Sequence, residues 1–164
     1  MSYRRFQDLS EEDRELLREA LEACDLADAP YSGFLVGAAL RADDGRVFLG
    51  ANSENAAFGA SLCAERTAYA HARAEGYVHR CVAIAIVTRR ARRPTKKAAT
   101  PCGECRQVLS DAAWWQGIGK DFKVFLAPTK FLEGEVIKET TIGRLLPDPF
   151  SPEDLGMKRN KKTK

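Results

Sequence analysis

The sequence predicts a three-layer α/β domain with a central mixed sheet of about five strands. Strand-like and helical segments alternate along the 164 residues, an order typical of a sheet covered by helices on both faces. A chain of this length suits one domain with a sizeable core. The expected strands span residues 34–42, 46–52, 81–88, 122–128 and 136–140, and the expected helices span residues 10–27, 62–75 and 102–114.

The limits of these elements follow from capping, turn and periodicity patterns. Ser10 is a good N-cap, and the acidic turn after it leads into apolar residues at helical spacing. The turn at residues 43–45, Asp-Asp-Gly, joins the first two strands as a hairpin. Residues 62–75 are rich in alanine and end at Gly76, a common helix stop. Residues 81–88 form a continuous apolar run, which predicts a strand covered on both faces.

Composition and charge indicate a globular domain with a short basic tail. Apolar residues make up 45% of the chain and charged residues 30%, and no apolar run is long enough for a membrane helix. Eleven of the 26 Lys and Arg residues lie in residues 89–97 and 158–164, which leaves 15 basic residues against 23 acidic ones. An acidic body argues against a general polyanion-binding surface. We expect residues 1–155 to form one domain of a cytoplasmic protein and residues 156–164 to form a disordered basic tail.

Three cysteines have the spacing of a catalytic metal site. Cys63 lies two residues before Glu65, and Cys102 and Cys105 form a C-x-x-C pair at the expected start of the next helix. Two helix N-termini can bring three thiolates to one Zn²⁺ and leave its fourth position open for water. Glu65 would then carry protons to and from that acidified water. Arg66 and the helix dipoles would offset the negative charge of three thiolates around one dication.

Two other interpretations of these cysteines stay open at this point. A closed structural zinc site would need a fourth ligand, for which the candidates are His71, His79, Cys24 and Cys81. His71 lies eight residues after Cys63 on the same expected helix, about 12 Å along its axis, so it cannot complete the same tetrahedron. A redox C-x-x-C pair would leave the first thiol and the glutamate after it without a role.

The cysteine motifs and their flanking segments resemble a known family. C-A-E followed by P-C-x-x-C is similar to the zinc-deaminase signature. Residues 12–155 resemble the small homotetrameric zinc-dependent cytidine deaminases in five segments: PYSGFLVGAAL (30–40), NSENA (52–56), CAERTA (63–68), PCGECRQV (101–108) and LLPDPFSPEDL (145–155). The resemblance implies the three-layer α/β/α cytidine-deaminase-like fold and one zinc ion per subunit. It also implies hydrolysis of cytidine or 2′-deoxycytidine to the uracil nucleoside and ammonia, a pyrimidine salvage reaction.

The resemblance further implies which residues contact the substrate. Asn52 and Glu54 would hydrogen-bond the ribose 3′-hydroxyl, and Phe34 would pack on the nucleoside. Backbone groups around Ala64 and Thr100 would hold the pyrimidine carbonyl and the departing amino group. An aromatic wall with a few polar anchors suits such a small, partly apolar ligand.

The resemblance also implies a residue shared between subunits, and this sequence departs from the family pattern at several positions. A neighbouring subunit of the homotetramer would supply Phe150 to the pocket. Phe58 stands where many relatives have Tyr, and Glu104 adds a charge between two of the cysteines. The basic segment 89–97 is longer and more charged than usual. A charge run is ordinarily a solvated loop, and the alternative is a contact with a substrate phosphate or a nucleic acid.

Two further functions share the same cysteine–glutamate core. A blasticidin-type aminonucleoside deaminase is the nearest rival enzyme, although residues 52–55 match the nucleoside deaminases better. A non-catalytic zinc- or RNA-binding module on the same fold is the rival from another class, and it would have no need of Glu65. Turnover of cytidine separates these alternatives.

Overall fold

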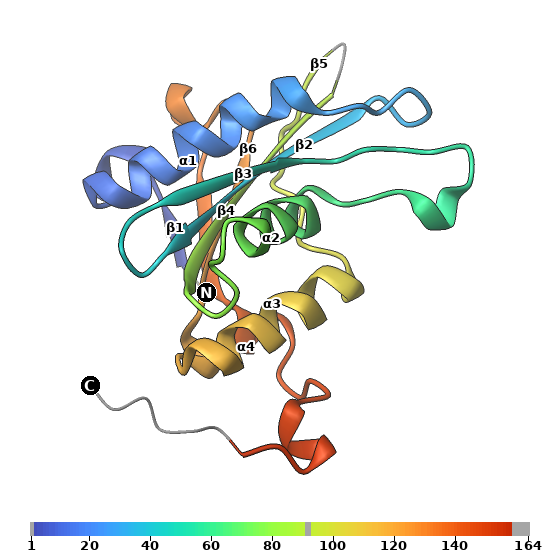
Figure 1. Ribbon diagram of the computed structural model, residues 1–164. Helices are drawn as coiled ribbons and strands as arrows, with labels where there is room; N and C mark the ends of the chain where they lie inside the picture. The colour runs from blue at the N-terminus through green and yellow to red at the C-terminus, as the bar shows by residue number, and fades with distance from the viewer. Residues whose placement is uncertain (1, 91–92, 159–164) are drawn as a thin grey trace.

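The computed structural model describes residues 2–90 and 93–158, and a single mixed sheet forms its centre (Figure 1). In this part of the chain the sheet has seven strands in the order β1-β7-β6-β4-β2-β3, with β5 paired to β4. The strands are β1 (Ser2–Arg4), β2 (Phe34–Ala42), β3 (Val47–Ala51), β4 (Cys81–Arg90), β5 (Arg93–Pro94), β6 (Lys123–Pro128) and β7 (Ile137–Thr141).

Helices cover both faces of the sheet. The α-helices are α1 (Glu11–Ala23), α2 (Ala64–Ala74), α3 (Gly103–Gln116) and α4 (Ile142–Leu145). Short 3-10 helices are η1 (Phe6–Asp8), η2 (Cys24–Leu26), η3 (Phe58–Ala60), η4 (Gly119–Asp121), η5 (Phe131–Glu133) and η6 (Pro152–Leu155). In Figure 1, α1 lies on one face of the sheet, while α2 and α3 lie on the other. None of the helices described here is long and apolar enough to cross a membrane.

The strand pairing confirms the predicted fold class. β2 and β3 form the antiparallel hairpin expected from the Asp-Asp-Gly turn, whereas β4 and β6 are parallel and connected through α3. A parallel pair needs such a crossover, and the combination gives a mixed sheet between two helical layers. The five expected strands are present, and the short edge strands β1 and β5 were not predicted because they contain only three and two residues.

Alternating side chains of β4 build a core on each face of the sheet. Ile84 and Ile86 belong to a cluster with buried residues of α2 and α3. Ala83, Ala85 and Val87 belong to a second cluster with buried residues of α1. The continuous apolar run of this strand therefore serves two cores, as expected for a central strand.

Two glycines let the helices approach the sheet closely. A Cβ atom on Gly37 of β2 would lie 2.1 Å from the Ala20 carbonyl oxygen of α1. A Cβ atom on Gly50 of β3 would lie 2.2 Å from the Ala68 nitrogen and 2.4 Å from the Ala64 oxygen of α2. Only glycine fits at such distances, so these positions set how deeply each helix sits on the sheet.

A buried ion pair connects α1 to the sheet. Nη2 of Arg41 in β2 donates to Oδ1 of Asp13 in α1 at 2.8 Å, and both side chains are about one-tenth exposed. A buried charge is tolerated when it is paired in this way, and removing one partner is costly.

The prediction of a loop over the basic segment 89–97 is partly wrong. β4 continues through Arg90, which pairs with Phe34 of β2, and Arg93 of β5 pairs back to Arg90. Pairing with β2 extends the strand beyond the apolar run because ladder hydrogen bonds do not require apolar side chains. Residues 91–92 of this segment and residues 159–164 of the expected basic tail lie outside the described residues.

Candidate metal centre and active site

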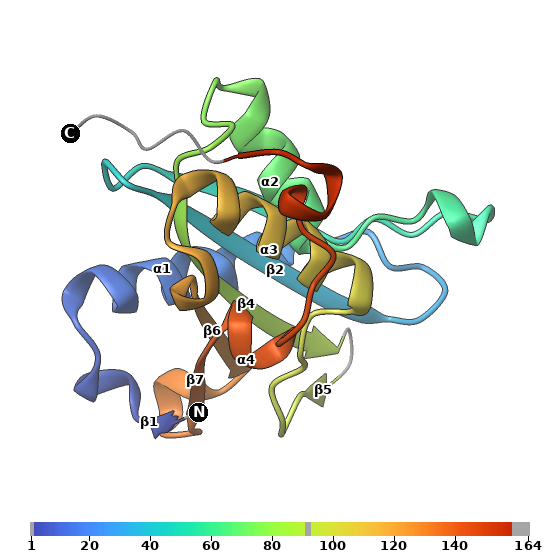
Figure 2. The same cartoon turned by 90° about the horizontal axis from the view of Figure 1, so that it is seen from below.

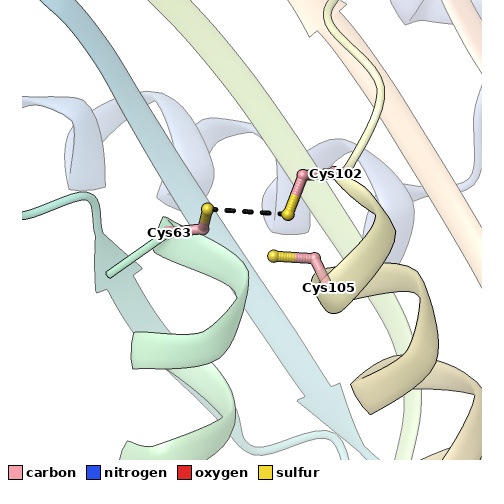
Figure 3. Close-up of side chains that lie close together, drawn as sticks. All are labelled: Cys63, Cys102 and Cys105. Atoms are coloured by element: carbon pink, nitrogen blue, oxygen red, sulfur yellow. Dashed lines mark hydrogen bonds between the residues drawn. The ribbon is translucent and has the colours of Figure 1, made fainter. Parts of the chain in front are cut away.

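Three thiols converge where α2 and α3 begin (Figure 3). Cys63 is the N-cap of α2, Cys102 is the N-cap of α3, and Cys105 lies in the first turn of α3. The Sγ atoms of all three lie within 4.8 Å of one another, and those of Cys63 and Cys102 are 3.8 Å apart. The two predicted helix N-termini therefore meet at one point.

The geometry of the three thiols fits zinc. Thiolates bound at about 2.3 Å to a tetrahedral zinc ion lie about 3.8 Å from each other, which matches the separation of Cys63 and Cys102. Within the described residues this is the one group of three or more Cys, His, Asp or Glu side chains close enough to hold a metal ion. Soft thiolates favour zinc among common metals, and three protein ligands leave one position open.

The residues considered for a fourth ligand lie elsewhere. Nδ1 of His71 is 3.1 Å from the Leu49 carbonyl oxygen, and the ring of His79 stacks on Trp115 with centroids 4.8 Å apart. The thiol of Cys24 donates to the Val87 carbonyl at 3.4 Å, on the other face of the sheet. The arrangement is that of an open site rather than of a closed structural one.

The thiols share their protons unequally. Hydrogen bonds that the Cys63 sulfur accepts from Cys105 and Cys102, together with the charge of Arg66, lower the pKa of Cys63 to about 6. The pKa of Cys105 is raised because its thiol donates to Cys63 and is buried. The Cys63 thiol thus ionises before that of Cys105, and the N-terminus of α2 favours the resulting thiolate.

Arg66 and Glu104 form an ion pair across the two helices. Nη1 of Arg66 lies 3.2 Å from Oε2 of Glu104, and Nη2 donates to the Ser61 carbonyl at 3.1 Å. Glu104, whose negative charge the sequence places between two cysteines of an anionic site, therefore has a positive partner. The pair also ties the start of α2 to the start of α3, next to Cys63 and Cys102.

Glu65 is a buried acid beside the thiols. It lies in the first turn of α2 with an exposure of 5%, and it lines a cavity together with Cys63 and Cys102. Burial, reinforced by the nearby Cys63 sulfur, raises the pKa of Glu65. A carboxyl group in this environment can hold a proton and release it, as proton transfer requires.

The cavity next to the thiols, called the central cavity below, has a volume of about 290 Å³. Phe34, Asn52, Glu54, Ala64 and Thr100 all line it, so five of the six predicted substrate contacts are brought together. The lining residues that the sequence did not single out are Ser32, Val36, Ser53, Ser61, Leu62, Ile86, Thr88 and Ala99. They are small or aliphatic residues of strands and loops, and nothing in their local sequence distinguishes them from core residues.

Hydrogen bonds fix the two polar anchors of the central cavity. The Asn52 side chain accepts from the Val36 N–H at 2.8 Å and donates to the Phe34 carbonyl at 2.9 Å. The Glu54 carboxylate accepts from the Tyr31 N–H at 2.9 Å and from the hydroxyl and N–H of Ser32. These bonds lower the pKa of Glu54, so this side of the cavity carries a negative charge.

Phe150 does not reach the central cavity of its own chain. Its side chain is 60% exposed, and its carbonyl accepts a hydrogen bond from Gln107 of α3 at 2.6 Å. Phe58 of η3 is also exposed, at 74%, and meets Tyr31 edge-on with ring centroids 5.7 Å apart. Phe58 and Tyr31 therefore form an exposed aromatic pair outside the chain's own core.

Comparison with known proteins gives one consistent result. Residues 10–116 match the family described as the cytidine and deoxycytidylate deaminase zinc-binding region. This chain belongs to the cytidine deaminase family. It is 44% identical over 140 residues to a cytidine deaminase of Halalkalibacterium halodurans, covering 85% of this chain and 95% of the relative. It is 41% identical to a cytidine deaminase of Sporosarcina psychrophila, covering 85% and 92%.

Solved structures of cytidine deaminases have the same fold. The enzyme of Burkholderia pseudomallei is 40% identical with a TM-score of 0.71, covering 87% of this chain and all of that one. The enzyme of Mycobacterium tuberculosis is 35% identical with a TM-score of 0.64, covering 84% and 97%. The family match includes all three clustered cysteines, so zinc is the cofactor of this cytidine deaminase family member and the three thiols are its candidate ligands.

Proposed function

We propose that the protein catalyses the zinc-dependent hydrolytic deamination of cytidine or 2′-deoxycytidine, which yields the uracil nucleoside and ammonia. The observation that carries this proposal is the buried Glu65 beside three thiols at the wall of a cavity. A protein that only binds zinc or RNA would gain nothing from burying a carboxyl group beside the thiols, because burial costs that group its solvation. Membership of the cytidine deaminase family supports the same reaction.

Glu65 has the environment of a proton carrier for this reaction. The chemistry that zinc supplies when bound to Cys63, Cys102 and Cys105 is a water molecule acidified enough to lose a proton near neutral pH. The Glu65 carboxylate takes the proton of the attacking water and delivers it to the ring nitrogen N3. It then takes the proton of the new hydroxyl on C4 and passes it to the amino nitrogen, so that the C4 carbonyl forms as the C4–N bond breaks and ammonia leaves. Its raised pKa lets one group act as base and then as acid.

The other cavity residues orient the nucleoside. We assign Asn52 and Glu54 to the ribose 3′-hydroxyl and Phe34 to the face of the nucleoside, because all three line the central cavity around the position of Glu65. Backbone groups at Ala64 and Thr100 are assigned to the pyrimidine carbonyl and the amino group. Hydrogen bonds to Ser32 and Tyr31 fix the Glu54 carboxylate before the substrate arrives, which reduces the entropy lost on binding.

Ultraviolet absorbance of cytidine tests the proposal. Zinc-loaded wild-type protein should deaminate cytidine, and Glu65→Gln should retain zinc but lose about 10²–10⁴-fold in kcat. Glu75→Gln is the matched control, because Glu75 is an exposed acid at the C-cap of the same helix. A wild-type protein with one zinc per chain and no turnover would refute the activity. Faster turnover of blasticidin S than of cytidine would favour the aminonucleoside reaction instead.

We also propose a homotetramer in which Phe150 completes the cavity of a neighbouring subunit. The support is the exposure of Phe150 away from its own cavity, and the segment with η3 that projects from the layered body in both views (Figures 1 and 2). Light scattering measures the assembly. Co-expressing Glu65→Gln with Phe150→Ala tests the sharing, since mixed assemblies would contain some sites with both native residues and regain activity that neither variant has alone.

The proposal also covers the limits of the catalytic domain and the cellular compartment of the protein. Residues 1–155 are proposed to form the single catalytic domain, since η6 ends at Leu155 and all described strands belong to one sheet. A chain ending after Leu155 should keep the thermal stability and the cytidine turnover of the full chain. The proposed cytoplasmic location agrees with five free cysteines, which a reducing compartment preserves.

A further inference from the structure

A second hollow, called the basic depression below, adjoins the central cavity. It has a volume of about 330 Å³ and is lined by residues at the end of β4 and in and after β5. Figure 2 shows β5 beside the end of β4. Its lining consists of Phe34, Arg90, Arg93, Pro94, Thr95, Lys96 and Lys97. Four of these residues are cations and none is an acid.

Two connections place the basic depression beside the central cavity. The Phe34 side chain lines both hollows. Thr88 lines the central cavity, and its carbonyl accepts a hydrogen bond at 2.6 Å from the hydroxyl of Thr95, which lines the basic depression. Thr95 is fixed further by its N–H, which donates to the Thr129 hydroxyl at 3.1 Å. The wall between the two hollows is therefore a segment after β5 that is hydrogen-bonded to β4 at Thr88.

The charge of the basic depression is not neutralised by neighbouring acids. Within residues 2–90 and 93–158, none of its four cations forms an ion pair, whereas the adjacent Arg89 is paired with Asp25 at 2.6 Å. The Arg90 guanidinium lies over the Phe34 ring, 5.5 Å from its centroid, so this cation sits at the wall that the two hollows share. Unpaired cations concentrated in one hollow attract an anionic group of similar size.

We propose that the basic depression binds the 5′-phosphate of a pyrimidine nucleoside monophosphate whose base and ribose occupy the central cavity. This inference rests on the proposed function and specifies its substrate. Phe34, assigned to the face of the nucleoside, is the wall shared with the basic depression, so a group extending from the nucleoside past this ring meets the cations. The Glu54 carboxylate, assigned to the 3′ side of the ribose, would repel a 3′-phosphate.

The experiment compares cytidine, cytidine 5′-monophosphate and cytidine 3′-monophosphate at low and high salt. The 5′-monophosphate should have a kcat/KM at least equal to that of cytidine at low salt, and this should fall as salt screens the phosphate. The Arg93→Gln/Lys97→Gln variant should lower kcat/KM about tenfold for the 5′-monophosphate alone. The control Arg5→Gln/Lys158→Gln removes the same charge at two exposed positions and should change neither substrate.

Several results would overturn the proposal. A 5′-monophosphate that is a poorer substrate than cytidine at every salt concentration excludes the site, and an equal gain for the 3′-monophosphate shows general attraction. Tighter binding of a short oligocytidylate than of the monophosphate assigns the cations to nucleic acid instead. If no substrate is deaminated, the proposed function fails, and calorimetric binding then decides: an affinity for the 5′-monophosphate that Arg93→Gln/Lys97→Gln does not reduce rejects the phosphate site.

Discussion

The close approach of α2 to β3 at Gly50 should set the geometry of the metal centre. In Gly50→Ala, the new Cβ would lie 2.2 Å from the Ala68 nitrogen, so α2 must move by about 1.2 Å to restore an ordinary contact of 3.4 Å. Overpacking of this kind costs about 1–3 kcal/mol. We expect a loss of about 3 kcal/mol, since the atoms met are backbone, and a fall in Tm of about 6–12 °C for a chain of this size.

The same displacement should weaken zinc binding. Cys63 is the N-cap of α2 and moves with it, while Cys102 and Cys105 belong to α3. Zinc–sulfur distances tolerate only about 0.2 Å, so we expect at least a tenfold loss of zinc affinity in Gly50→Ala, measured by competition with a chromophoric chelator below the Tm.

Gly37→Ala is the matched control. Its Cβ would lie 2.1 Å from the Ala20 oxygen, so the overpacking is equally severe, but it displaces α1 on the opposite face of the sheet. This variant should lose similar stability and keep its zinc affinity. Gly59→Ala, which meets no atom within 4 Å, should change neither quantity. Equal zinc affinities in Gly50→Ala and Gly37→Ala would refute the view that the close packing of α2 on β3 positions the thiols.

Three further perturbations probe the charges and thiols of the molecule. Asp13→Asn removes one charge of the buried ion pair between α1 and β2 and should cost about 3 kcal/mol in urea unfolding, so an unchanged midpoint would contradict the pairing. Arg66→Gln leaves the Glu104 charge unpaired beside the thiols and should lower kcat about threefold. Adding Glu104→Gln removes that charge and should restore part of kcat. Additive losses of kcat in the double variant would argue against coupling between the two residues. Burial raises the pKa values of Cys24 and Cys81 to about 11, so both thiols stay protonated at pH 8. Both should therefore resist iodoacetamide, with or without a chelator, and react only when the protein unfolds. Mass spectrometry of the labelled peptides measures this.

The metal centre was predictable from the sequence because its information is local. Cys102 and Cys105 lie three residues apart at the start of one helix, and such spacing places both thiols on the same side. The alternation of strands and helices then indicated that the helix carrying Cys63 starts at the same edge of the sheet. The main elements were predictable for a similar reason, since caps, turns and periodicity act over a few residues.

Features that depend on contacts between distant segments were not predictable. Glu104 looked unfavourable in its motif, and only the packing of α2 against α3 shows Arg66 opposite it. The strand character of Arg90 and Arg93 depends on the pairing of β4 with β2 and of β5 with β4, which outweighs their charged composition. Phe150 illustrates a further limit: its proposed role in the cavity of a neighbouring subunit depends on contacts outside its own chain.

The ion pair between Arg66 and Glu104 changes the charge balance expected at the metal centre. A zinc dication on three thiolates carries one net negative charge, and Arg66 alone could have offset it. Because Glu104 already neutralises Arg66 at 3.2 Å, the pair contributes little net charge. The compensation then falls to the N-termini of α2 and α3, each equivalent to about half a positive charge, which together balance the single negative charge. The convergence of two helix starts, rather than any one basic side chain, is therefore what makes a three-thiolate site compatible with acidifying a water molecule.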